Sequence, residues 1–317
     1  MTKRNVLFNS VGIAVVCLAL ASVGKASVPR AFVSINGIDT NPCSATQPCR
    51  SFSQALAAVQ AGGEIVVQNS GGYSTGFTIA QSVTIDAAGY NASVISTSAS
   101  DLCTISAGPA DRVVLRGLNF HGAGIGQNAI KAAQVGSLYV EHCSISEFSG
   151  NGVDMPNGGN LFVTGTEVRA CNDGIAVTSN NVTAGNVIAH DSRFTECSVG
   201  VFLRAISNVN AKAALSNCTA SLCFDGFFTE SDYSGSAVMT LTNCGSVANL
   251  AGLVMKTLSA GDAIIRLANC AVTDNNIGFL FTQSGGGTAA ALGTNPATNL
   301  VSGNTTNLST QGSITLQ

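Results

Sequence analysis

The sequence predicts an all-β protein folded as a parallel β-helix, a solenoid whose coils are built from short strands. The first observation is a repeat, because five glycines lie 26 residues apart: Gly174, Gly200, Gly226, Gly252 and Gly278. The second is that each glycine precedes an apolar run whose residues alternate with a period of two, as strands do. The third is composition, since 35 Gly and only 10% charged residues suit strands joined by tight turns. Units of this length bury their strands by stacking, about 4.8 Å apart.

The chain opens with the features of a secretory signal peptide, residues 1–26. Lys3 and Arg4 are followed by the apolar run Val11–Val23, and then by the small-x-small motif that ends at Ala26. We expect cleavage there, which leaves residues 27–317 as a single secreted or periplasmic domain with no membrane span. A permanent anchor is the alternative, but about 13 apolar residues fall short of the roughly 20 that a spanning helix needs.

Removal of the signal peptide leaves ten cysteines in an exported chain, in which disulfides are permitted. Cys43 and Cys49 bracket the short loop SATQP, and we expect these two to pair. The pairing of the others stays open. Cys17 would suit a lipoprotein, but Val16 precedes it where a small residue is expected.

Residues 51–61 predict a short amphipathic helix with an apolar face of Phe52, Ala55, Leu56 and Val59. The first coil of a solenoid would otherwise expose its apolar cross-section, so this helix is expected to act as a cap. Gly62–Gly63 is expected to end the helix, and the sequence EIVV to begin the first strand.

The clearest coils span residues 113–282, and side chains recur within them in columns. One column consists of Asp191, Asn217, Asn243 and Asn269, which predict an amide ladder at a turn. The next consists of Ser192, Cys218, Cys244 and Cys270, whose thiols are expected to fill the interior as small apolar groups. The repeated glycines are expected at tight corners that need an unusual φ. Residues 283–317, rich in Gly, Thr and Asn, predict an irregular last coil or tail.

A family resemblance rests on the N-terminal stretches VSINGIDTNPC, PCRSFSQAL, GEIVV and GGY. This segment resembles the opening of bacterial right-handed β-helix proteins of the pectate-lyase-like superfamily, and a weaker likeness extends to about residue 282. The resemblance implies a right-handed solenoid. It implies little about chemistry, because many activities share this fold.

The sequence departs from the catalytic patterns that the resemblance would imply. The Asn-Thr-Asp, Asp-Asp, Gly-His-Gly and Arg-Ile-Lys segments of polygalacturonase-like hydrolases are absent, as is the Asp-Pro-His-Asp signature of the epimerases. Asp173 and Asp225 occupy equivalent positions two coils apart, about 9.6 Å, which is too far to share the calcium ion of a pectate lyase. Neither a CxxC motif nor a His-rich cluster indicates a metal, and we expect no metal and no cofactor.

Two further function classes are disfavoured. His190, Asp191 and Ser192 stand in a row, but consecutive strand residues point to opposite faces, so they do not form a catalytic triad. A net charge of −3 with no basic stripe argues against nucleic acid as a partner.

The strand after each repeated glycine predicts the surface of most interest. If Val201 and Leu203 point inward, alternation turns Phe202 and Arg204 outward. The same rule gives an outward apolar column of Asp154, Ala176, Phe202, Phe228, Val254 and Leu280, and beside it a charged column of Thr178, Arg204, Glu230, Lys256 and Thr282. An exposed apolar patch usually marks a contact. Three partners could cover this apolar column: the C-terminal tail or a long turn of the same chain, a polysaccharide, or another subunit.

The leading functional hypothesis is a non-catalytic surface protein that contacts polysaccharide through Phe202, Phe228, Val254 and Leu280. The alternative is a lyase or hydrolase of uronic-acid polymers, with Lys256 or Glu230 as the base and Arg204 as the charge neutraliser. A third hypothesis is a structural or adhesive protein. The sequence leaves open whether the chain is an enzyme, and also its oligomeric state.

Overall fold

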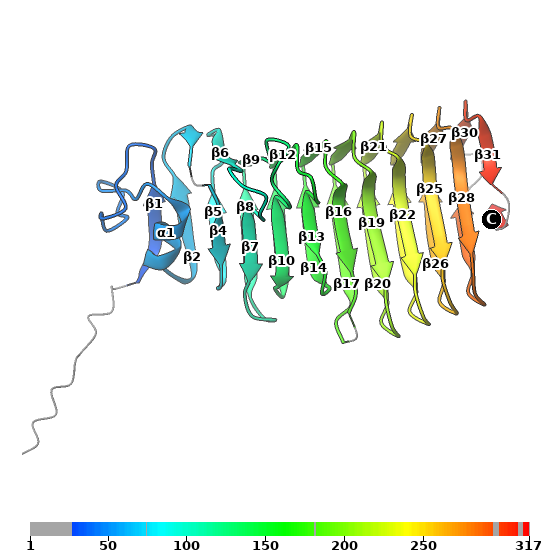
Figure 1. The fold of residues 1–317 in the computed structure, drawn as a ribbon, viewed down its shortest axis with the longest axis horizontal. Coiled ribbons are helices and arrows are strands. Elements are labelled where there is room, and N and C mark those ends of the chain that lie inside the picture. The colour runs from blue at the N-terminus through cyan, green and yellow to red at the C-terminus, as the bar shows by residue number, and fades with distance from the viewer. Residues whose placement is uncertain (1–26, 74, 181, 294–297, 310–312, 317) are drawn as a thin grey trace, which may run out of the picture.

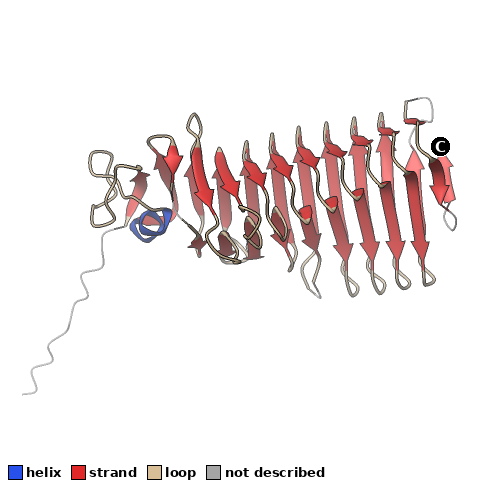
Figure 2. Cartoon of the chain, turned by 45° about the horizontal axis from the view of Figure 1, so that its top comes forward, coloured by secondary structure: helices blue, strands red, loops and turns tan. Residues whose placement is uncertain are grey.

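The computed structural model describes residues 27–73, 75–180, 182–293, 298–309 and 313–316. These residues form a solenoid of parallel strands with one short α-helix near its N-terminal end (Figures 1 and 2). The prediction of an all-β solenoid is thereby confirmed. The predicted signal peptide, residues 1–26, lies outside the described residues. Within the described part, no helix is long and apolar enough to cross a membrane.

Each regular coil contributes one strand to each of three parallel sheets, in the order A, B, C along the chain. Sheet A contains β1 (Val28–Val33), β2 (Val59–Val67), β5 (Val83–Asp86), β8 (Arg112–Arg116), β11 (Ser137–Glu141), β14 (Gly159–Thr164), β17 (Gly185–His190), β20 (Ala211–Ser216), β23 (Ala237–Thr242), β26 (Ala263–Ala268), β29 (Ala289–Gly293) and β32 (Ser313–Leu316). Sheet B contains β3 (Gly71–Gly72), β6 (Ala92–Ile95), β9 (Leu118–His121), β12 (Ser144–Ser146), β15 (Glu167–Arg169), β18 (Arg193–Thr195), β21 (Thr219–Ser221), β24 (Gly245–Val247), β27 (Ala271–Thr273) and β30 (Leu300–Ser302). Sheet C contains β4 (Phe77–Ile79), β7 (Cys103–Ser106), β10 (Ile130–Gln134), β13 (Val153–Met155), β16 (Asp173–Thr178), β19 (Val199–Ala205), β22 (Asp225–Ser231), β25 (Ala251–Thr257), β28 (Ile277–Gln283) and β31 (Thr306–Ser309).

The helix α1 (Phe52–Ala58) is shorter than predicted and packs against β1, β2 and β4. Ser51 caps its N-terminus by accepting a hydrogen bond from the Gln54 backbone N–H. The prediction that Gly62–Gly63 ends the helix is wrong, because the chain is already extended at Val59, which pairs with Val28. Both glycines therefore lie inside β2.

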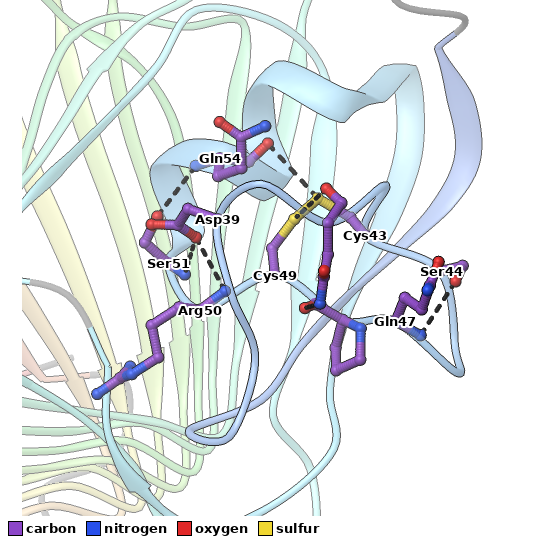
Figure 3. The surroundings of a disulfide bond; sticks show 10 residues. Asp39, Cys43, Ser44, Gln47, Cys49, Arg50, Ser51 and Gln54 are labelled. Atoms are coloured by element: carbon purple, nitrogen blue, oxygen red, sulfur yellow. Dashed lines mark hydrogen bonds between the residues drawn. A yellow bond between two sulfur atoms is a disulfide. The ribbon is translucent and has the colours of Figure 1, made fainter.

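The predicted disulfide between Cys43 and Cys49 is present in the loop before α1 (Figure 3). Asp39 supports this loop by accepting hydrogen bonds from the backbone N–H groups of Arg50 and Ser51, both at 2.9 Å. The disulfide thus closes a loop whose ends are already held by backbone contacts to β1.

Inward-facing side chains from all three sheets form one continuous core. Phe194 from sheet B and Phe227 from sheet C are among its largest fully buried members. Burial of such a side chain contributes roughly 1.5–3 kcal/mol. The core therefore extends along the solenoid axis, and each coil depends on its neighbours for burial.

The repeated glycines serve close packing, and the prediction that they need an unusual φ is wrong. None of the five has a positive φ. A Cβ added to Gly200 would lie 2.5 Å from the Gly226 carbonyl oxygen, and one added to Gly226 would lie 2.5 Å from that of Gly252. From Gly174 to Gly252, the backbones of successive coils approach too closely at this column for any side chain.

The predicted amide column lies at the turn between sheets A and B. Asn217, Asn243 and Asn269 all have φ between +52° and +54°, as does Asp191 at +51°. Asparagine and aspartate tolerate this left-handed conformation, which explains their recurrence. Only one hydrogen bond links the column among the described residues, from Asn217 Nδ2 to Asp191 Oδ1 at 3.0 Å.

A continuous amide ladder occurs instead inside the turn between sheets B and C. Asn249 Nδ2 donates to Asn275 Oδ1 at 3.1 Å, and Asn275 Nδ2 donates to Asn304 Oδ1 at 3.0 Å. The same two oxygens also accept the backbone N–H groups of Asn249 and Asn275. Asn249 Oδ1 likewise accepts the backbone N–H of Cys223. Sequence inspection missed this ladder, although Asn249 and Asn275 lie 26 residues apart.

The eight free cysteines of the described chain are all buried, as expected of core residues. Burial raises the pKa of Cys103 above its ordinary range. The thiols of Cys218, Cys244 and Cys270 each donate to the carbonyl oxygen two residues earlier, at 3.3 Å. These thiols therefore fill the interior and add a second hydrogen bond to carbonyl groups at the ends of sheet A strands.

The C-terminal segment continues the solenoid. Strands β29, β30, β31 and β32 pair with β26, β27, β28 and β29, respectively. The described part of residues 283–317 thus continues all three sheets.

Candidate functional site

The outer face of sheet C carries the residues that the sequence singled out. Val201, Leu203 and Phe227 are fully buried, so the alternation along β19 and β22 runs as predicted. Phe202 pairs with Ala176 and Phe228, and Val254 pairs with Phe228 and Leu280. Parallel in-register pairing therefore stacks the outward side chains of successive coils into columns.

We call Phe202, Phe228, Val254 and Leu280 the apolar stripe. The rings of Phe202 and Phe228 lie 5.0 Å apart between centroids and are tilted by 54°. Both phenylalanines and Leu280 are half-buried, but Val254 is only 3% exposed because its neighbours on both sides cover it. The surface that a ligand could touch is therefore narrower than expected, and Val254 contributes little to it.

Exposed apolar side chains also occur on the turn that leads from sheet B into sheet C. Phe224 is 60% exposed and Leu250 is 39% exposed, at equivalent positions of neighbouring coils. Sequence inspection missed both, although each lies two residues before a repeated glycine. They add exposed apolar surface on the turns that precede strands β22 and β25.

We call Arg204, Glu230 and Lys256 the charged row. Arg204 Nε lies 2.8 Å from Glu230 Oε1, and Lys256 Nζ lies 2.9 Å from Glu230 Oε2. The Glu230 side chain is only 8% exposed, and Arg204 also contacts Asp232 at 3.4 Å. A buried carboxylate is stable here because two cations flank it. Use of Glu230 or Lys256 as a base would require an ion pair to be broken.

Two carboxyl groups, Asp173 and Asp225, lie at the N-terminal ends of strands β16 and β22 in sheet C. We call them the edge aspartates. Burial raises the pKa of Asp173 to about 6, and the nearby Asp154 and Asp225 carboxylates add to the shift. Burial alone raises the pKa of Asp225 to about 6. Among the described residues, Asp225 Oδ1 has no hydrogen-bond partner. Desolvation without a compensating contact favours the protonated form.

The row His190, Asp191 and Ser192 serves the turn between sheets A and B. Ser192 is fully buried and donates to the His190 carbonyl oxygen at 2.8 Å, while His190 Nδ1 contacts Ser216 Oγ. The three side chains do not converge on one point, as strand geometry predicted.

No group of three or more His, Cys, Asp or Glu side chains suited to a metal ion occurs within the described ranges. The two edge aspartates and the charged row are separate groups on one sheet face.

A solenoid of coils that stack into three parallel sheets places the chain in the class of β-solenoid proteins. The family model for the right-handed β-helix region matches residues 60–213, 94–249 and 129–306, so the chain belongs to this family. Among solved structures, pectate lyase Pel9A is 16% identical, with 92% of this chain and 78% of that chain covered and a TM-score of 0.56. XylC in complex with xylose is 7% identical, with 86% and 69% covered and a TM-score of 0.60. At these identities the likeness concerns the fold alone. Comparison with curated proteins finds no significant match.

Proposed function

We propose that the protein is an exported, non-catalytic β-helix protein that binds polysaccharide along the apolar stripe of sheet C. The observation that carries the proposal is the Phe202–Phe228 pair, which places two half-buried rings 5.0 Å apart on the outer face. Aromatic rings offer a flat apolar surface to the C–H groups of a sugar ring. A row of this kind on a surface usually marks a contact.

The charged row would border such a ligand. Arg204 and Lys256 are about one third exposed, at 35% and 34%, so their donors reach the surface while Glu230 neutralises part of their charge. Fixed donors beside an apolar platform give a sugar chain both stacking and hydrogen bonds.

The test is binding of purified protein to a panel of soluble polysaccharides, with and without calcium, measured by affinity electrophoresis. Phe202→Ala and Phe228→Ala are expected to weaken binding about tenfold or more with little change in melting temperature. Tyr139→Ala, an outward aromatic position on sheet A, is the matched control and should bind as the parent does. If no polymer binds, a structural or adhesive role replaces this proposal.

A hydrolase of uronic-acid polymers is the second candidate, and the edge aspartates favour it. Asp173 and Asp225 both have a pKa raised to about 6 and stand two coils apart, about 9.6 Å. Carboxyl groups at roughly this separation serve inverting glycoside hydrolysis, in which one protonated carboxyl acts as the general acid. Reducing ends released by the parent protein and lost in Asp225→Asn would establish this activity, whereas equal release by both proteins would exclude Asp225.

Export rests on the first 26 residues, and the Cys43–Cys49 disulfide is compatible with it. We expect the mature protein, expressed in a bacterium with a secretion pathway, to begin at or near Ser27. N-terminal sequencing that finds Met1 retained would contradict export by a cleaved signal peptide.

A further inference from the structure

Six of the buried cysteines lie in two columns that the proposed function does not use. Each column takes one cysteine from each of three successive coils, and its members are 26 residues apart. We call them the thiol columns. The first lies at the turn between sheets B and C and the second at the turn between sheets A and B: Cys171, Cys197 and Cys223, and Cys218, Cys244 and Cys270.

The register of the flanking strands stacks the thiols of each column above one another. Strands β15, β18 and β21 pair in register before the first column, and β16, β19 and β22 after it. The strands around the second column pair in the same way. Stacked strands are about 4.8 Å apart, within the roughly 4.4–6.8 Å that separates the Cα atoms of a disulfide. The middle thiol, Cys197 or Cys244, accordingly contacts the thiols on both sides of it.

The second column also shows what its position requires where no thiol is present. One coil earlier it contains Ser192, whose hydroxyl donates to the His190 carbonyl oxygen at 2.8 Å. The coil before that contains Thr166, which forms the corresponding bond. The thiol of Cys218 forms it at 3.3 Å. Since a hydroxyl serves the turn as a thiol does, this hydrogen bond does not explain a run of three cysteines.

Contacts with backbone carbonyl groups distinguish the two ends of each column. The last thiols, Cys223 and Cys270, each contact two carbonyl oxygens at 3.3–3.7 Å. The first thiols, Cys171 and Cys218, each contact one, at 3.5 and 3.3 Å. Hydrogen bonds from the neutral thiol disfavour the thiolate, so the thiolate forms more readily at the first position. Contact with the next thiol also lowers the pKa of Cys171 and of Cys218.

We propose that the thiol columns are oxidation sites, at which a small-molecule disulfide introduces one bond between neighbouring coils in each column. The first thiolate, Cys171 or Cys218, attacks the reagent, forms a mixed disulfide and releases one thiol. The middle cysteine, Cys197 or Cys244, then attacks the sulfur of the first, closes the disulfide and releases the second thiol. Two protein thiols are oxidised, one reagent disulfide is reduced, and the two protons pass to the released thiols.

The third cysteine of each column stays a thiol. Because the column thiols are at most 5% exposed, the reagent reaches them only when a turn opens locally, which favours a small oxidant. A metal is disfavoured as the occupant, since no suitable group of ligands occurs within the described ranges. Each disulfide would join adjacent coils and so oppose their separation. The inference concerns the interior and is independent of polysaccharide binding on sheet C.

The experiment incubates the folded full chain with 2-hydroxyethyl disulfide at neutral pH without denaturant. The sample is then quenched with acid, unfolded, alkylated, digested at basic and acidic residues, and mapped by tandem mass spectrometry. The expected products are the disulfides Cys171–Cys197 and Cys218–Cys244, with the third cysteine of each column alkylated. Cys103 and Cys143 are internal controls: both are buried thiols outside the columns, and both should be fully alkylated.

The variants Cys197→Ser and Cys244→Ser each remove a middle thiol. Each should lose the disulfide of its own column and keep that of the other column. Serine suits these turns, as Ser192 shows, and the melting temperature of each reduced variant checks its folding. Cys223→Ser and Cys270→Ser retain the first and middle thiols, so these matched controls should form both disulfides. The oxidised parent should melt at a higher temperature than the reduced parent, and the double variant Cys197→Ser/Cys244→Ser should not respond to the reagent.

Columns that stay fully reduced in the folded parent would overturn the inference. A parent disulfide that includes Cys223 or Cys270 would do the same, because the middle thiol would then have paired with the wrong neighbour. Equal modification of Cys103 and Cys143 would show oxidation of the unfolded chain and would also overturn it. An unchanged melting temperature in the oxidised parent would refute the joining of adjacent coils.

Discussion

At the residue scale, the repeated glycines set how closely successive coils pack. A Cβ on Gly226 would lie 2.5 Å from the Gly252 carbonyl oxygen and would also meet Ser246 Oγ and Asn249 Nδ2. These atoms belong to backbone or to buried, hydrogen-bonded side chains, so they do not move aside at low cost. The glycine repeat is therefore a packing requirement of the coil and not a turn signal.

Gly226→Ala is expected to lower the free energy of unfolding by about 2–4 kcal/mol, and Gly226→Val by more, because overpacking forces the neighbouring coil to shift. Chemical denaturation measures the change. Gly286→Ala is the matched control, since a Cβ there meets no atom within 4 Å. Equal stability of the two alanine variants would refute the packing explanation.

The edge aspartates give a second residue-scale prediction. Because the folded-state pKa of Asp173 and Asp225 is about 6, above the unfolded value, the folded protein binds protons that the unfolded chain has released. Their contribution to stability is thus present at low pH and is lost as pH rises from about 4 to about 6. The parent should lose roughly 1–2 kcal/mol per group over this window relative to the double variant Asp173→Asn/Asp225→Asn.

Denaturation at a series of pH values measures that difference. Glu167→Gln, at an exposed acid on sheet B, controls for the removal of a negative charge alone. A parent and double variant with parallel pH profiles would show that the two carboxyls ionise as ordinary surface groups.

At the element scale, the turns between strands differ in how their backbone is stabilised. The turn between sheets A and B places asparagine or aspartate at its positive-φ position, as in Asn217 and Asn243. The turn between sheets B and C places Leu222 and Ala248 there, at φ of +56° and +55°, which is costly for such residues. The ladder of Asn249, Asn275 and Asn304, whose first two members are buried, offsets this cost by satisfying the backbone of that turn.

Asn249→Ala is expected to destabilise the protein by about 2–3 kcal/mol, because the buried Cys223 N–H loses its acceptor and the Asn275 side chain loses a donor. Asn276→Ala, at an exposed position one coil later, should change stability by less than about 0.5 kcal/mol. Thermal melting of both variants provides the measurement. A larger loss in Asn276→Ala would mean that the ladder does not hold this turn together.

At the scale of the whole molecule, the solenoid is held together by contacts between neighbouring coils. Its N-terminal coil packs against α1, and a disulfide closes the loop that precedes this helix, whereas the C-terminal coil ends in the short strands β30, β31 and β32. Stability in such a molecule is close to a sum over coils and their interfaces. Local opening should therefore begin at the C-terminal end.

Hydrogen exchange measured by mass spectrometry should show the slowest exchange in β19, β22 and β25, which have complete coils on both sides. Protection should decrease towards β31 and β32, and the first coil should exchange more slowly than the last. Uniform protection along the whole solenoid would contradict a structure stabilised coil by coil.

The sequence by itself determined the architecture, because stacked coils must repeat their side chains. Three local patterns were enough. The 26-residue spacing from Gly174 to Gly278 indicated the coils, the alternation around Phe202 indicated the inner and outer strand faces, and the short loop between Cys43 and Cys49 indicated the disulfide. Only the tertiary structure decided which side chains are accessible and how they are charged. The burial of Val254, the pairing of Glu230 with two cations and the raised pKa of Asp225 all depend on neighbours in adjacent coils. Spacing along one strand does not reveal those neighbours' distances, since these follow from the register and twist of the assembled sheets.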